Sequence, residues 1–287
     1  MPSAPYRVRV LAGGAAAELA LSGCGAGTGA PSEPATSDPR PAVTAAAAVR
    51  PAAPAGAPVA AAPPAGRAAP AGGPPVVVLD PGHNGGNAAH PAAIGRPVPD
   101  GRGGTKACNT TGTTTDAGSP EHAFTFDVAR RVEQRLTARG VRVVLTRADD
   151  AGVGPCVDER GRAGQGADAD AVVSIHGDGA APGGRGFHVA FADPPLNDVQ
   201  RGPARRLAAD LRDGLAAAGF PRSTYVGRDG LSPRVDLAGL NLATRPAALV
   251  ECANMRNPAE ARAVASPDGR DRYAAAIADG ILRFLRV

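Results

Sequence analysis

The chain has 287 residues, a formal net charge of +4 and a sequence pI of about 9.2. Nearly all of its cations are Arg, it has no Trp, and no basic cluster carries interleaved aromatic side chains. This composition excludes the usual signature of a nucleic-acid-binding protein, so we predict no nucleic-acid partner. Beyond residue 24, no stretch approaches the roughly 18 apolar residues that a membrane-spanning helix needs.

Residues 1–24 have the pattern of an export signal. Arg7 and Arg9 give a positively charged start, and a short, mostly apolar stretch follows them. The stretch ends in a Leu-Ser-Gly-Cys sequence that resembles the lipobox of bacterial lipoproteins, which implies lipidation of Cys24. Glu18 inside the apolar stretch is a departure from the pattern, because a carboxylate weakens the core of a signal, and the alternative is a plain secretory signal with a chance Cys. Either signal predicts export, and lipidation would add a membrane anchor.

Residues 25–75 form a low-complexity segment of Ala, Pro and Gly. The segment contains no aromatic residue, no Leu and no Ile, so it has little to bury, and its prolines oppose helix formation. We predict a disordered, partly extended linker. Apolar runs begin at Val76, and the remainder of the chain to Val287 is long enough for one domain with a sizeable core.

Apolar runs and turn signals beyond Val76 predict strands that alternate with helices. The expected strands lie at 76–80, 141–145, 171–175, 186–191 and 247–250, and the expected helices at 119–139, 158–166, 199–218 and 271–285. Ser119 is expected to cap the first helix, and the Gly-, Thr- and Asn-rich stretch 85–118 to be a long loop. The alternation predicts an α/β fold, with a mostly parallel, twisted sheet and helices on both faces.

Four polar residues stand where these elements begin or end. His83 follows the first strand, His176 ends the third, Glu251 ends a later one, and Glu121 lies in the first turn of the first helix. The carboxyl ends of parallel strands share one edge of the sheet, and a helix entered from that edge can start near it. We therefore expect the four side chains to converge.

The residue types in this set suit metal-assisted hydrolysis. Two neutral imidazoles and one carboxylate form a zinc site whose fourth position stays open for water. A second carboxylate outside the ligand set can accept and return a proton. A single His at a strand end is more often structural, but the set as a whole predicts one Zn²⁺ held by His83, Glu121 and His176, with Glu251 as the catalytic acid/base.

Several short motifs recur in order along the folded part of the chain. They are Leu79-Asp-Pro-Gly-His83, Glu121 after a Gly-rich loop, Leu145-Thr-Arg147, Arg160, Ala169-Asp170, Ser174-Ile-His176 and Pro246-Ala-Ala-Leu-Val-Glu251. These motifs resemble those of the zinc-dependent N-acetylmuramoyl-L-alanine amidases of the amidase 3 family. The resemblance covers residues 76–287, and the long loop with two cysteines is similar to the small mycobacterial amidases of this family.

The resemblance implies the same site residues as the strand-end argument. It makes His83, Glu121 and His176 the zinc ligands and Glu251 the catalytic acid/base, acting on peptidoglycan or muropeptides outside the cytoplasm, in the cell wall or periplasm. Two departures concern how substrate sits: a long insertion follows the first motif, and Gly177-Asp178 stands where Asn is frequent.

The cysteines predict one cross-link. Cys108 and Cys156 lie in two loops, and in an oxidising compartment a disulfide between them is the economical interpretation. Cys252, at the end of an apolar strand, is expected to be a free buried thiol. Because no two cysteines are close in sequence, a cysteine-based zinc site is disfavoured.

Other polar residues and other functions stay open from the sequence alone. His122 and His188 are expected to be structural, Arg160 to form a salt bridge, and Asp80 either to orient a metal ligand or to stabilise its turn. The competing functions are a zinc peptidase acting on stem peptides of peptidoglycan and a non-catalytic peptidoglycan-binding lipoprotein. A monomer is the default, and the stretch 87–118 is a candidate for regulating access.

Overall fold

The computed structural model describes residues 73–287. The predicted signal at 1–24 with Cys24, and the predicted linker up to residue 72, lie outside the described residues. In the described range, no helix is both long and apolar enough to cross a membrane.

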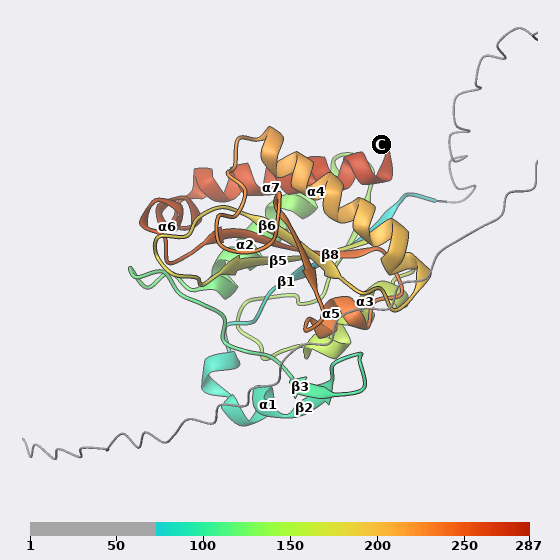
Figure 1. Cartoon of the computed structure of the whole chain (residues 1–287), viewed down its shortest axis with the longest axis horizontal. Helices are drawn as coiled ribbons and strands as arrows, with labels where there is room; N and C mark the ends of the chain where they lie inside the picture. Colours follow the sequence, from blue (N-terminus) through green and yellow to red (C-terminus); the bar gives the residue numbers. More distant parts are fainter. Residues whose placement is uncertain (1–72) are drawn as a thin grey trace, which may run out of the picture. The chain divides into compact units, whose positions relative to one another are not determined.

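A six-stranded sheet forms the centre of the described part (Figure 1). Its strand order is β4-β1-β5-β8-β6-β7. The first four strands in that order run parallel, whereas β6 pairs antiparallel with β8, and β7 pairs parallel with β6. The mostly parallel sheet is confirmed. The strands are β1 (Val76–Pro81), β4 (Arg142–Leu145), β5 (Ala171–Asp178), β6 (His188–Ala192), β7 (Leu231–Arg234) and β8 (Ala247–Asn254).

Helices cover both faces of this sheet, as predicted, and Figure 1 shows α4 and α7 opposite α3 and α5. Alternate side chains of β1 enter two separate cores, with Val77 and Leu79 in one and Val76 and Val78 in the other. A strand buried on both faces is a continuous apolar run, which is why 76–79 is recognisable. The first core lies under α2 (Glu121–Thr137), α4 (Arg205–Ala217), α6 (Pro258–Ala265) and α7 (Pro267–Leu285), and the second under α3 (Val157–Gly166) and α5 (Ala238–Asn241).

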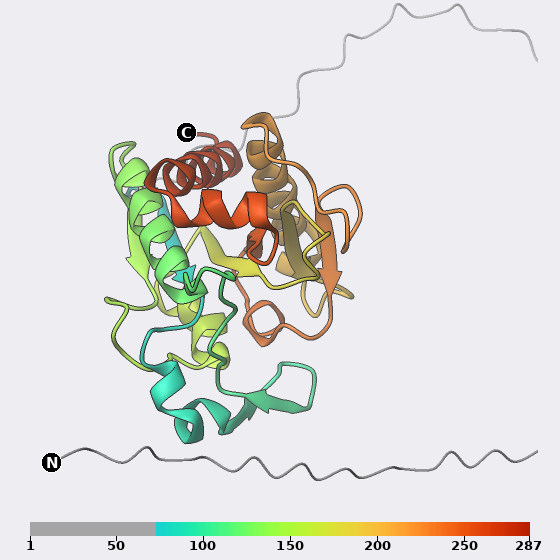
Figure 2. The same cartoon turned by 90° about the vertical axis from the view of Figure 1, so that its left-hand side faces the viewer.

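The stretch predicted as one long loop contains short elements. They are a 3-10 turn (Asn87–Ala89), α1 (Pro91–Gly95) and an antiparallel ribbon of β2 (Pro97–Pro99) and β3 (Thr105–Ala107). Figure 2 shows this segment on the side of the sheet away from α7. Elements of three to five residues are too short to show a period, so the loop prediction was wrong here.

Three further expectations need correction. The strand β7 and the helices α5 and α6 were not predicted, since each is short or lacks a clear apolar stripe. The predicted helix at 199–218 begins as a π-turn (Gln200–Ala204) with Pro203 inside it, before α4 starts. Ser119 does not cap α2, because Pro120 occupies that position without a side-chain cap.

A disulfide joins Cys108 to Cys156. It links the segment after β3 to the residue before α3, and it packs in a small cluster with Val98 and Val157. Cys252 is buried and forms no disulfide within residues 73–287. The covalent link therefore ties the segment 87–118 to the body of the domain near the carboxyl edge of the sheet.

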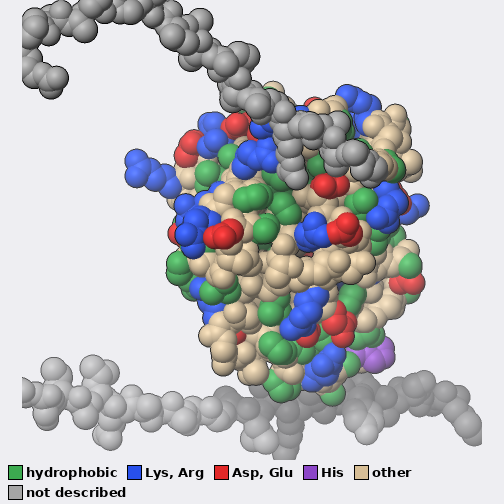
Figure 3. Space-filling model, turned by 90° about the vertical axis from the view of Figure 1, so that its right-hand side faces the viewer, with side chains coloured by type: hydrophobic (Ala, Val, Ile, Leu, Met, Phe, Trp, Pro, Cys, Tyr) green, Lys and Arg blue, Asp and Glu red, His purple; other side chains and the backbone are tan. Residues whose placement is uncertain are grey.

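Charges on the surface are interspersed. On the face drawn in Figure 3, Lys and Arg side chains lie among Asp and Glu side chains. Exposed pairs such as Arg256–Asp116, at 2.9 Å, contribute little to stability but offset the excess of Arg locally.

Candidate metal centre

Two of the predicted strand-end residues, His176 and Glu251, stand in one cross-strand row together with His188. Glu251 on β8 is in register with His176 on β5 on one side and with His188 on β6 on the other. Registered residues of neighbouring strands project from the same face of a sheet. The row lies on the face packed by α3 and α5, at the carboxyl ends of β5 and β8.

His83 and Glu121 complete the cluster from outside the sheet. Glu121 Oε2 lies 3.2 Å from His83 Nε2, and Glu121 Oε1 lies 2.9 Å from His176 Nδ1. The imidazole centroids of His83 and His176 are 5.0 Å apart and nearly perpendicular. One donor atom from each of the three residues falls within 4.8 Å of the others, so the structure brings the predicted ligands together.

The carboxylate of Glu121 is fixed and ionised. It accepts hydrogen bonds from the backbone amides of Thr113 at 2.9 Å and Gly177 at 3.1 Å, and it stands at the positive end of the α2 dipole. Burial alone would raise the pKa of Glu121, but the two imidazoles outweigh it and hold that pKa well below the ordinary value. The cluster therefore presents a permanent negative charge between two imidazoles.

The loop 109–113 orients His83. Its Nδ1 lies 3.0 Å from the carbonyl oxygen of Thr110. When Nδ1 donates its hydrogen to that oxygen, Nε2 carries no proton and presents its lone pair on the side of Glu121. His83 also has a φ of 60°, a strained conformation that is concentrated at functional sites. Gly112 approaches so closely that a Cβ there would meet Glu121 Oε2 at 2.7 Å. Neither Thr110 nor Gly112 was predicted from the sequence, where a Gly among threonines is their only signal.

Gly82 packs flat against the ring of His176. A Cβ at this position would lie 2.2 Å from His176 Cε1, so any side chain displaces the imidazole. We expect Gly82→Ala to destabilise the protein by about 1–3 kcal/mol, the usual cost of overpacking a filled site. Denaturant unfolding of the metal-free protein checks this.

The matched control for that experiment is Gly166→Ala at the end of α3. No atom of the described segment lies within 4 Å of a Cβ built there, so this change should be neutral or slightly stabilising. Equal unfolding midpoints for the Gly82 variant and the wild type would contradict the close packing against His176.

Glu251 stands beside the cluster without belonging to it. Its Oε2 is buried and, among the described residues, has no hydrogen-bond partner. Burial, and then the negative charges of Glu121 and Asp178, raise the pKa of Glu251 well above the ordinary value, while Arg234 lowers it. A carboxyl with a raised pKa is suited to accept a proton and return it near neutral pH.

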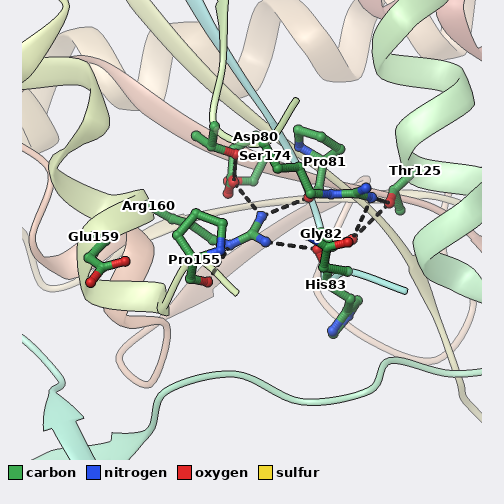
Figure 4. Close-up of polar contacts among 12 residues, drawn as sticks. Asp80, Pro81, Gly82, His83, Thr125, Pro155, Glu159, Arg160 and Ser174 are labelled. Atoms are coloured by element: carbon green, nitrogen blue, oxygen red, sulfur yellow. Dashed lines mark hydrogen bonds and ion pairs between the residues drawn. The ribbon is translucent and has the colours of Figure 1, made fainter. Parts of the chain in front are cut away.

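Arg160 ties the turn that carries His83 to the rest of the domain (Figure 4). Its Nη1 lies 2.7 Å from Asp80 Oδ1, which is the structural salt bridge expected from the sequence. Asp80 also accepts hydrogen bonds from the hydroxyls of Thr146 and Ser174 and none from a candidate ligand, so it stabilises the turn. The guanidinium also donates to the carbonyls of Pro81, His83, Gly154 and Pro155.

His122 points away from the cluster, as expected for a structural residue. Its Nδ1 lies 2.7 Å from Asp150 Oδ2, and the other carboxylate oxygen of Asp150 pairs with Arg147 Nη1 at 2.9 Å. Arg147 also donates to the carbonyl of Pro81. Arg147 and Arg160 therefore both donate hydrogen bonds to the turn that carries His83.

A cavity of about 190 Å³ opens next to the candidate ligands. His83 and His176 form part of its wall, Lys106 reaches it from β3, and most of the remaining surface is apolar. The apolar lining comes from α5, α3 and the sheet, including Leu237, Leu240, Leu249 and Val157. This cavity is large enough to receive part of a substrate beside the metal position.

The open α/β sheet carries a His, Glu, His cluster at its carboxyl edge, with the Glu251 carboxylate in register with His176. This arrangement defines a metal-dependent hydrolase. A sequence model of the amidase 3 family, described as N-acetylmuramoyl-L-alanine amidase, matches residues 77–283. The chain belongs to this family and is an amidohydrolase, so the resemblance predicted from its motifs is confirmed.

Individual relatives agree with the family assignment. The chain is 50% identical over 210 residues to the N-acetylmuramoyl-L-alanine amidase Rv3717 of Mycobacterium tuberculosis. The aligned region covers 73% of this chain and 86% of the relative. It superposes on the crystal structure of Ami1 from Mycobacterium smegmatis with a TM-score of 0.73 and 53% identity, covering 75% of this chain and 98% of that one. It also superposes on the crystal structure of apo Ami1 from Mycobacterium abscessus, with a TM-score of 0.72 and 50% identity, covering 74% of this chain and 99% of that one.

Proposed function

We propose that this chain is a zinc-dependent N-acetylmuramoyl-L-alanine amidase. It hydrolyses the amide between the lactyl group of N-acetylmuramic acid and L-Ala, in peptidoglycan or in muropeptides. The observation that carries the proposal is the buried, ionised Glu121 carboxylate placed between the imidazoles of His83 and His176, with Glu251 beside it. The family membership and the 50% identity to a named amidase support the choice of scissile bond.

The donor set fits Zn²⁺. His83, Glu121 and His176 offer two nitrogens and one oxygen, and their side chains are only 11%, 4% and 18% exposed. Two metal-free imidazoles drawn to one buried carboxylate are a costly arrangement unless a cation or protons share the site. Zinc bound there supplies a Lewis acid that polarises the scissile carbonyl and makes water a better nucleophile.

The residues of the chain then divide the remaining work. Glu251 accepts the proton of the attacking water as it adds to the lactyl carbonyl, and its raised pKa makes that transfer favourable. The same carboxyl returns the proton to the L-Ala nitrogen, which leaves as an amine. Thr110 keeps the ring of His83 turned toward the site through its carbonyl oxygen.

The place of action follows from the substrate class. Cell-wall peptidoglycan lies outside the cytoplasm, which agrees with the export signal predicted at 1–24. We propose that the lipobox-like sequence anchors the protein through Cys24 and that the linker lets the catalytic domain reach the wall near the membrane. A monomer is sufficient for this arrangement, because one chain supplies all four site residues.

The test is mass spectrometry of muramyl dipeptide incubated with the purified protein. We expect N-acetylmuramic acid and a dipeptide with a free L-Ala amine, no product after treatment with a chelator, and recovery when zinc is added. A peptidase acting on stem peptides would instead leave L-Ala attached to the sugar. Release of that product, or unchanged turnover with chelator, would rule out the proposed function.

A further inference from the structure

His188 occupies the place next to Glu251 on the side away from the metal cluster. It is the first residue of β6 and is in register with Glu251, just as His176 is from the opposite side. Antiparallel neighbours in register have Cβ atoms about 4.5–5.5 Å apart, so the imidazole flanks the Glu251 side chain. His188 is only 1% exposed, which makes it the most buried His of the row.

The carboxyl of Glu251 has little else to hold it. Its Oε2 is buried without a hydrogen-bond partner among residues 73–287. A proton-transferring carboxyl must keep one orientation, and a misplacement of about 1 Å can cost about 100-fold in rate. The register instead places an imidazole on each side of this side chain, His176 from β5 and His188 from β6.

His188 is itself wedged in place. The ring of Tyr225 meets it edge-on, with centroids 6.1 Å apart and an angle of 89°. Tyr225 in turn lies close to the backbone of Gly184, because a Cβ built there would be 2.8 Å from its ring. The imidazole of His188 is therefore bordered by a ring that is itself packed against the backbone.

The imidazole is also neutral. Burial is the largest influence and lowers the pKa of His188 to about 4. The negative charge of Asp178 raises this pKa, whereas the positive charge of Arg234 lowers it further. Its Nδ1 is buried and finds no hydrogen-bond partner in the described part of the chain. A cation at this position would lower the pKa of Glu251, as Arg234 already does, and would weaken it as a proton acceptor.

We propose that His188 is the positioning residue of Glu251. It is a neutral ring that stops the carboxyl from turning away from the metal cluster, and it acts through Glu251 without contacting the substrate. The inference rests on the proposed function. It assigns to His188 a part in catalysis beyond the structural role expected from the sequence.

The test compares His188→Ala with His188→Phe in the zinc-loaded protein. We expect the Ala variant to lose about 10- to 100-fold in kcat, with KM within about threefold and an unchanged zinc content. The Phe variant keeps a neutral ring and should retain most of the kcat. If the Ala variant does not fold, His188→Gln takes its place in the test. The Gln side chain is long but flexible, so this variant should also show a lower kcat than the wild type.

Two controls separate positioning from general destabilisation. Val189→Ala truncates an equally buried side chain of β6 on the other face, and it should lower stability without the loss in kcat. In a Glu251→Gln background, His188→Ala should cause almost no further loss, because a residue acting through Glu251 has nothing left to position.

The inference is overturned if His188→Ala keeps the wild-type kcat, if it loses zinc, if His188→Phe falls as far as His188→Ala, or if the loss persists in the Glu251→Gln background. Failure of the proposed function looks different. In that case the wild type releases no free L-Ala amine from muramyl dipeptide, whatever residue stands at 188.

Discussion

Replacing Glu251 by Gln should lower kcat for amide hydrolysis by about 1,000-fold and leave the bound zinc unchanged. Gln keeps the size of the side chain and its place in the row between His176 and His188, but it cannot take a proton from water. Glu251 is not part of the three-residue cluster of candidate ligands, so its removal spares the metal site. The Glu251→Gln variant is expected to differ from the wild type in kcat much more than in KM.

Turnover of muramyl dipeptide and elemental analysis of the same preparation measure both halves of this expectation. The control is Glu133→Gln on α2, which removes one negative charge and a surface pair with Arg130 but lies outside the row. Its activity should equal that of the wild type. Wild-type turnover by the Glu251 variant would show that another group carries the proton.

Replacing Arg160 by Met should destabilise the domain by about 3–5 kcal/mol, the range observed when one partner of a buried ion pair is removed. The guanidinium and its partner Asp80 are both nearly fully buried, at 4% and 6% side-chain exposure. The variant leaves the carboxylate of Asp80 without its counter-charge. It also leaves carbonyl groups of the turn that carries His83 without their donor, so activity should fall as well.

The same variant should show a distinctive pH dependence. Burial would raise the pKa of Asp80, but Arg160 and two hydroxyls hold that pKa below its ordinary value. A lowered folded-state pKa stabilises the protein above the unfolded value of about 3.9, and this stability is lost as the pH falls through the folded-state value. The difference between wild type and Arg160→Met should therefore be largest near neutral pH and shrink below about pH 4.

Denaturant unfolding at several pH values measures this effect. Arg162→Met on the same helix is the matched control, because the side chain of Arg162 is 48% exposed in its pair with Asp158 and its loss should cost less than about 1 kcal/mol. Equal losses for Arg160 and Arg162 would mean that burial of the pair has no energetic consequence. A loss at Arg160 that does not depend on pH would remove Asp80 from the explanation.

The link between these predictions is the turn after β1. Asp80 is held by Arg160, Gly82 packs on His176, and His83 projects toward Glu121. Four consecutive residues thus connect the stability of the domain to the geometry of the candidate metal site. Variants that loosen the turn are expected to affect both together, whereas changes at Glu251 or His188 should affect catalysis with the metal site intact.

The amino-acid sequence alone determined the α/β class and the long elements. Strands buried on both faces are continuous apolar runs, and α2 has an apolar stripe at helical spacing, so both signals are local. It also singled out His83, Glu121, His176 and Glu251, because polar residues at the ends of such runs are unusual and the carboxyl ends of parallel strands meet at one edge.

Only the tertiary structure decided how these residues are supported. The reversed direction of β6 brings His188 beside Glu251, and no local pattern specifies the direction in which a strand enters a sheet. Likewise, the five groups that Arg160 binds come from segments up to 80 residues away, and the Gly112 contact depends on a loop folding back over α2. These contacts are long-range packing, which depends on the whole chain being in place, whereas propensity and periodicity act over a few residues.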